Sequence, residues 1–347
     1  MAHVEGTSAP LSILGALDPS APTPLGRSSI LRRMVAEPVT ALMIQRALVM
    51  DVAHPLVAAG VEDHSAFRSQ PWRRALITVD TGLRLVFGST ATARAAARQI
   101  YATHDRINGS VADPEGPFAP GHAYTAHDAA LLTWVWATLV DSVEVAYNRW
   151  VAPLAPDEAD AYYADMVAFA LFMGIPAELL PADRSAFAAY LEAMMDGDLL
   201  GTGETSRILA GHVLWFEHRL VPSPVVRLGR VLAVTTLDPR LLRRLGLRLD
   251  ADDERFAIRL DEVLSQYYPR LPRARAGLPM LYVSVRRPTV GLADRARRAR
   301  SRLDHVIAQG RIGQEDDREQ HGESDGDGLP SAPAGDGGHG DEGGECP

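Results

Sequence analysis

The chain has 347 residues, of which 46% are hydrophobic, and its formal net charge is −9. This composition is normal for a globular protein with one large domain or two smaller ones. The charge comes from one end, because residues 312–347 hold eleven acidic side chains and one arginine, which leaves about +1 for residues 1–311. A nearly neutral body argues against a nucleic-acid-binding protein.

The 35 basic residues are all arginine, and the one cysteine is Cys346 in the acidic tail. Without lysine, the chain has no Schiff-base lysine, no lysine general base and no phosphate-binding loop of the usual kind. With one cysteine, it has no internal disulfide and no thiolate-rich zinc or iron–sulfur site. A metal or cofactor would have to be held by histidine, carboxylate, tyrosine or methionine.

Helical patterns dominate the first half of the chain. Residues 38–52 form an apolar helical pattern that Pro55 ends, and residues 69–88 form a second one with Pro71 in its first turn and Gly88 at its end. A third helix is expected from a cap at Ser89 or Thr90 to Gly109. These patterns predict helices that pack an apolar stripe against a core.

The pattern continues after a loop at residues 116–128. Asp128 is expected to cap a helix over 129–150, and residues 157–174 and 183–197 each open with aspartate and close with glycine. Further amphipathic runs lie near 205–220, 225–235, 253–267 and 291–309, and "PMLYVSV" at 279–285 is the one fair strand candidate. We therefore predict an all-α fold with one large multi-helix domain.

The domain boundaries follow from composition. Residues 1–30 are predicted to be an N-terminal extension, residues 31–311 the helical domain, and residues 312–347 a disordered acidic tail, because the tail has few large apolar groups to bury. Asp141, flanked by apolar residues in the 129–150 helix, is expected to be a polar partner inside the bundle.

No membrane span and no export signal are expected. The most apolar run, "AALLTWVWATLV", has 12 residues, short of the ~20 that a spanning helix needs. The N-terminus lacks a secretory signal, and Glu37 and Pro38 follow Arg32-Arg33 where a twin-arginine signal would have an apolar run. The sequence predicts a cytoplasmic protein.

Histidines carry most of the chemical information. His104 shares a helical stripe with Ala97, Ile100, Tyr101 and Ile107, so its imidazole is either an ordinary core group bonded to a carbonyl or a ligand. His54 before Pro55 and His64 before Ser65 have the same two interpretations, as a helix-end and a turn histidine or as ligands. His122 and His127, in a loop rich in glycine and proline, are expected to be exposed, and His212 and His218 indicate no site.

Three stretches of the chain together resemble a known family. They are "QRALVMDVAHPLVAAGVEDHSAFRSQPWRR", "VFGSTATARAAARQIYATHDRINGS" and "LLTWVWATLVDSVEVAYNRWV". They resemble the oxygenases that include latex-clearing rubber oxygenases and the MpaB-type enzyme of mycophenolic acid biosynthesis, and the resemblance covers about residues 30–270. It implies a single large multi-helix domain around a cofactor pocket that holds non-covalent haem b, with O2 and an apolar small molecule as substrates.

The resemblance also implies roles for particular residues. His104, before the R-x-x-G-like ending at Arg106–Gly109, matches the histidine that binds the haem iron. Arg74 and Thr78 match an arginine and a threonine of the rubber-cleaving active site, and their spacing puts them on one helical face. Arg74 could pair with a haem propionate or polarise O2, or it could be an ordinary surface arginine. His54, His64 and Trp136 are the further candidates for contact with the cofactor.

Two positions depart from the family pattern. A lysine of the rubber-cleaving members falls at Ile77, and many relatives have histidine where this chain has Trp136. These departures argue against rubber as the substrate and favour one alternative to a haem oxygenase, a non-catalytic helical protein that binds an apolar ligand or a partner. A further alternative is a non-haem copper or iron site built from His54, His64 and His104.

Overall fold

The structure is a computed structural model that describes residues 25–270 except 27, 65–70 and 216–221, and of residues 71–76 it describes the backbone alone. The chain divides into two compact units, residues 1–286 and 287–347. All described residues belong to the first unit. The strand expected at 279–285, the helix expected at 291–309 and the acidic tail lie outside the described residues, and the predicted domain boundary at 311 stays a prediction.

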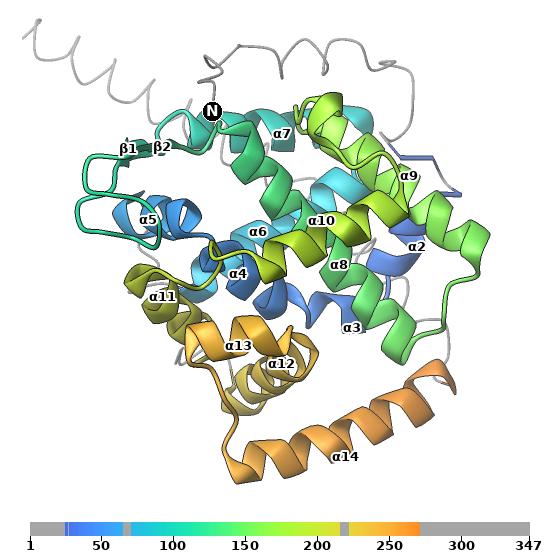
Figure 1. The fold of residues 1–347 in the computed structure, drawn as a ribbon. Helices are drawn as coiled ribbons and strands as arrows, with labels where there is room; N and C mark the ends of the chain where they lie inside the picture. The colour runs from blue at the N-terminus through green and yellow to red at the C-terminus, as the bar shows by residue number, and fades with distance from the viewer. Residues whose placement is uncertain (1–24, 27, 65–70, 216–221, 271–347) are drawn as a thin grey trace, which may run out of the picture. The chain divides into compact units, whose positions relative to one another are not determined.

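The described residues confirm the all-α class (Figure 1). The first half contains α2 (Ile30–Val35), α3 (Pro38–Ala41), α4 (Ile44–Ala53), α5 (Pro55–His64), α6 (Pro71–Phe87) and α7 (Thr90–His104). A short hairpin of β1 (Asn108–Ser110) and β2 (Ala123–Thr125) follows. The second half contains α8 (Ala129–Trp150), α9 (Pro156–Phe172), η1 (Ala177–Leu179), α10 (Arg184–Asp196), α11 (Glu204–Leu214), α12 (Ser223–Thr236), α13 (Pro239–Leu245), α14 (Ala251–Tyr267) and η2 (Tyr268–Arg270).

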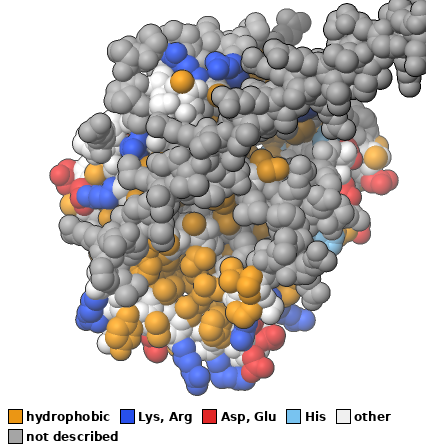
Figure 2. Space-filling view, turned by 180° about the vertical axis from the view of Figure 1, so that it is seen from behind, with side chains coloured by type: hydrophobic (Ala, Val, Ile, Leu, Met, Phe, Trp, Pro, Cys, Tyr) orange, Lys and Arg blue, Asp and Glu red, His pale blue; other side chains and the backbone are white. Residues whose placement is uncertain are grey.

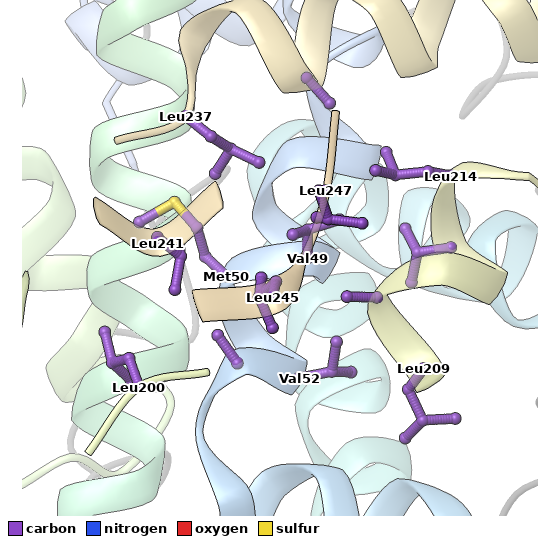
Figure 3. Close-up of a cluster of buried hydrophobic side chains, with 14 of the residues drawn as sticks. Val49, Met50, Val52, Leu200, Leu209, Leu214, Leu237, Leu241, Leu245 and Leu247 are labelled. Carbon is purple, nitrogen blue, oxygen red and sulfur yellow. The ribbon is translucent and has the colours of Figure 1, made fainter. Parts of the chain in front are cut away.

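Helices α4 and α8 pack on each other and each packs on several further helices. Helix α4 packs on α5, α8, α11 and α12, and α8 packs on α2, α3, α9 and α14 as well. Figure 3 shows one apolar cluster, in which Val49, Met50 and Val52 of α4 lie against leucines of α11 and α13. Full burial of each such side chain contributes about 1.5–3 kcal/mol, so these contacts stabilise the fold.

Helix α8 is long and apolar enough to cross a membrane by length and composition, and so is the pair α3–α4 with α5, which bends by 104°. Half of the apolar window of α8 is buried inside the protein. The core helix of a soluble protein meets the same criterion, so this finding leaves the expected lack of a membrane span as a prediction.

An ion pair links α4 to α8 in the interior. Arg46, whose side chain is 5% exposed, donates to Asp141 Oδ2 at 2.5 Å and to Ser142 Oγ at 2.8 Å. Its Nε donates to the carbonyl oxygen of Thr236 at the end of α12. The expectation that Asp141 is a polar partner within the bundle is confirmed.

Most of the expected helix caps are confirmed, and the exceptions have local causes. Ser89, Asp128 and Asp183 each accept a backbone N–H of the first turn that follows. The helix expected over 38–52 is divided into α3 and α4. Helix α9 begins at Pro156, one residue before the expected Asp157 cap, because proline is favourable in the first turn of a helix.

Gly109 was expected to end the helix that carries His104, and this expectation is wrong. Helix α7 ends at His104 with Asp105 as its C-cap, and Gly109 pairs with Tyr124 in the β1–β2 hairpin. A Cβ atom on Gly109 would lie 2.7 Å from the Tyr124 hydroxyl oxygen, which is closer than a side-chain contact allows. The glycine therefore serves a close approach between strands and not a helix end.

Candidate functional site

A cavity of about 730 Å³ lies among α4, α6, α7, α8 and α9. This volume is within the range of about 300–1,000 Å³ that cofactor and small-molecule sites occupy. Most of its wall is aliphatic or aromatic. The wall includes Ile44 and Leu48 of α4, Leu83 of α6, Ile100 of α7, Leu139 and Val143 of α8, and Phe169 of α9.

His104 lines this cavity from the last position of α7, where its side chain is half-buried. It shares the helix face with Ile100, which also lines the cavity, as the helical spacing predicts. The ring of His127 lies beside it, with the two ring centroids 5.8 Å apart and the planes at 72°. The structure therefore places the candidate iron ligand on the cavity wall.

His64, the last residue of α5, lines the same cavity and is exposed. Its Nε2 lies 2.9 Å from the carbonyl oxygen of Asn108, so Nε2 donates and Nδ1 carries the lone pair in the neutral ring. The fold thus brings His64 and His104 to one cavity from two different helices.

His54 lies elsewhere and does not line the cavity. It is buried at the junction of α4 and α5, where its Nδ1 accepts the backbone N–H of Leu56 and its ring stacks on Phe118 at 6.3 Å. Burial lowers the pKa of His54 to about 4, partly opposed by the charge of Asp128. The imidazole is therefore neutral at pH 7, with its Nδ1 already occupied by a backbone donor.

The described residues contain no group of three histidine, cysteine, aspartate or glutamate side chains that could hold a metal ion. His54, His64 and His104 all belong to those residues, so they do not form the three-histidine copper or iron site considered from the sequence. The physical reason is the packing of α4 on α5, which turns His54 toward Phe118.

Thr78 and Trp136 also line the cavity. Thr78 is half-buried on α6, and Arg74 lies four residues earlier on the same helix, with a side chain outside the described part of the chain. Trp136 is 2% exposed, and its indole N–H donates to the carbonyl oxygen of Met166 at 2.8 Å. Ile77 lines the cavity while 47% exposed, which puts it at the cavity edge.

Two features of the site were missed from the sequence. Asp51 of α4 lines the cavity and accepts a hydrogen bond from the Thr138 hydroxyl at 2.6 Å. A lone carboxylate in the apolar run of α4 was the available signal. His127 was expected to be exposed, and this is wrong, because its side chain is 25% exposed and bonded to Asp105. Nothing in its glycine-rich loop indicated that contact.

The fold and the cavity define a class of protein: a helical domain with a cofactor-sized apolar cavity and histidines in its wall. The family follows from comparison with known sequences. Residues 31–266 match the family described as ER-bound oxygenase mpaB/B'/Rubber oxygenase, catalytic domain, and because this match covers more than half of the chain, the chain belongs to that family. The resemblance expected from the sequence motifs is confirmed.

Two curated mycobacterial proteins are similar to this chain. They are the uncharacterised proteins Rv2237 of Mycobacterium tuberculosis and Mb2261 of Mycobacterium bovis, each 30% identical over 159 residues. The alignment covers 43% of this chain and 58% of each relative, so the match spans little more than half of their length. No solved structure matches the chain.

Proposed function

We propose that this protein is a haem-b-dependent oxygenase that uses O2 to oxidise an apolar small molecule, with His104 as the iron ligand. The observation that carries the proposal is the position of His104 in the wall of an apolar cavity of about 730 Å³, in a chain that belongs to an oxygenase family. The proposed enzyme acts in the cytoplasm, with neither nucleic acid nor a membrane span as part of its function.

The residues of the cavity fit a haem in three respects. The wall is mainly apolar, as a flat macrocycle requires, and the volume is that of a cofactor site. An imidazole lies in the wall at His104, and imidazole is a common axial ligand of haem iron. When bound, the haem would supply the redox chemistry, while the protein would supply binding, orientation and electrostatics.

The side chains around the cavity have separate proposed roles. His104 would hold the iron, and Thr78 would offer its hydroxyl to a ligand in the cavity. Arg74, four residues before Thr78 on α6, would pair with a propionate or act on O2. Trp136 would form an apolar wall, because its N–H is already bonded to Met166. His54 would take no part in cofactor binding, since it lies outside the cavity wall.

His64 is the second histidine in the wall, and its role is separable from that of His104. Its Nε2 is held by the Asn108 carbonyl, whereas the exposed position of the ring puts it at the outer boundary of the cavity. We therefore assign His64 to contact with the bound cofactor and His104 to the iron. On this assignment, losing His64 weakens haem binding less than losing His104.

The test is an absorption spectrum of the full chain after reconstitution with haem. We expect a Soret band from the wild type, its loss in His104→Ala, and a reduced but present band in His64→Ala. His212→Ala is the matched control, because His212 is exposed on α11 and is not part of the cavity wall. Equal haem content in His104→Ala and the wild type would end the assignment.

A second function has a specific observation in its favour. Trp136 fills the position of a family histidine and directs its N–H to a backbone carbonyl, and Ile77 replaces a family lysine, so neither offers a reactive group to the cavity. These features favour a non-catalytic protein that binds an apolar ligand. A wild-type protein that binds apolar ligands, takes up no haem and keeps its full stability would support that function.

A further inference from the structure

The His104 ring is contacted by a ring from outside its own helix. His104 is the last residue of α7, and the chain leaves the helix at Asp105. A helical side chain leans back over the preceding turn, so Ile100 and Tyr101 are the neighbours of His104 on its own helix, and contacts from other segments act together with these to set its rotamer. The ring of His127 meets it edge to face, with centroids 5.8 Å apart and planes at 72°. This is a favourable arrangement for two aromatic rings.

His127 is itself held from three sides. Its Nε2 is 2.9 Å from Asp105 Oδ1, a hydrogen bond that needs the proton on Nε2. The ring of Tyr101 packs against it with centroids 4.4 Å apart. Its backbone N–H donates to the Thr125 hydroxyl at 3.2 Å. A ring fixed in this way has little freedom of its own, so it can restrict a neighbour.

The β1–β2 hairpin brings the two histidines together. The N–H of Ile107 donates to the His104 carbonyl, and the N–H of Ala126 donates to the Ile107 carbonyl. These bonds join the end of α7 to the strand that precedes His127. Gly109 permits this pairing, because a Cβ there would meet the Tyr124 hydroxyl. The short hairpin therefore brings the His127 ring into contact with the His104 ring.

We infer that His127 is a positioning residue: its ring, packed on Tyr101, restricts the His104 imidazole to the orientation in which it lines the cavity. Iron-binding histidines are commonly oriented by a hydrogen-bonded partner, and here a ring contact would take that place. The link to haem rests on the proposed function. The restriction of the ring does not, since it arises from contacts within the protein.

The first test uses the full chain without haem, labelled with ¹³C and ¹⁵N at histidine. His127→Phe keeps an aromatic ring, His127→Gln keeps an Nε2-like donor for Asp105 without a ring, and His122→Ala is the matched control. His122 is in the same loop but packs on Phe118, with centroids 4.6 Å apart. We expect one sharp set of His104 ring signals in the wild type, His127→Phe and His122→Ala, and broadened or averaged signals in His127→Gln.

The second test is haem titration of the same variants. We expect half-saturation of His127→Gln to need about tenfold more haem than the wild type, with His127→Phe within about twofold of it. Unchanged His104 ring signals in His127→Gln would overturn the inference, and so would broadened signals in a folded His127→Phe. If the wild type takes up no haem but the His104 ring signals differ among the variants as expected, the proposed function is wrong and the positioning role of His127 stands.

Discussion

Replacing Asp141 by alanine would remove the partner of a buried cation and so tests how the interior of the bundle is held. Arg46 is 5% exposed and Asp141 is 23% exposed, and their closest atoms are 2.5 Å apart. Breaking a fully buried pair from one side costs about 3–5 kcal/mol, because an uncompensated charge stays in the interior. The pair is one of the few polar connections between α4 and α8.

Two features of this pair reduce the expected cost. Arg46 keeps two acceptors, Ser142 Oγ and the Thr236 carbonyl, after Asp141 is lost. Removing Asp141 also relieves its repulsion of Glu144, whose pKa is raised first by burial and also by Asp141. We therefore expect Asp141→Ala to lower the free energy of unfolding by about 2–3 kcal/mol, the lower part of the range for buried pairs.

The assay is urea denaturation followed by far-ultraviolet circular dichroism. Asp160→Ala is the matched control, because Asp160 is 73% exposed and faces Arg184 at 3.5 Å, and an exposed pair of this kind contributes at most about 1 kcal/mol. Arg46→Met combined with Asp141→Ala should recover part of the loss, since no charge is then left in the interior. If Asp141→Ala costs no more than Asp160→Ala, the reasoning is refuted.

Two further predictions concern stability. The free energy of unfolding should fall as the pH drops below 6.5. The reason is that burial holds the pKa of His54 at about 4 in the folded protein, whereas the same side chain takes up a proton near pH 6.5 in the unfolded chain. The loss reaches roughly 3 kcal/mol by pH 4. His54→Asn, which keeps an acceptor for the Leu56 N–H, should flatten this pH dependence in denaturation midpoints measured from pH 7 to pH 4. Glu115 is 4% exposed and accepts the backbone N–H groups of Thr205 and Ser206 at the start of α11. Glu115→Ala should therefore lower the free energy of unfolding by about 1–2 kcal/mol. Chemical denaturation with the exposed Glu178→Ala as control checks this, and equal midpoints for the two variants would count against a capping role.

The surface of the protein carries exposed apolar side chains that are separate from these interior contacts. Seen from the side opposite to Figure 1, apolar side chains gather on the lower half of the face, with arginines around them (Figure 2). Exposed apolar residues in the described part of the chain include Trp215, Val225 and Ile258. The Arg230 guanidinium lies 5.5 Å from the centroid of the Trp215 ring, so an arginine side chain covers part of this exposed indole. Exposed apolar residues such as these three are normal on a globular protein and carry no functional conclusion.

The sequence by itself determined the helices, most of their ends and the family. Ser89, Asp128 and Asp183 could be identified as caps because a cap bonds backbone groups two or three residues away, so its signal is local. His104 could be singled out because its stripe partners lie within one helix. The family motifs are likewise continuous stretches of the chain.

Only the tertiary structure decided which of these residues meet. Asp51 accepts a hydrogen bond from Thr138, Arg46 forms an ion pair with Asp141, and the His127 ring packs on His104. In each case the two residues come from different segments of the chain. Such contacts depend on how α4, α7, α8 and the hairpin pack in three dimensions. Helical periodicity and capping residues are local features of the sequence and do not predict that packing. For the same reason the sequence grouped His54 with His64 and His104, whereas packing against Phe118 keeps His54 out of the cavity wall.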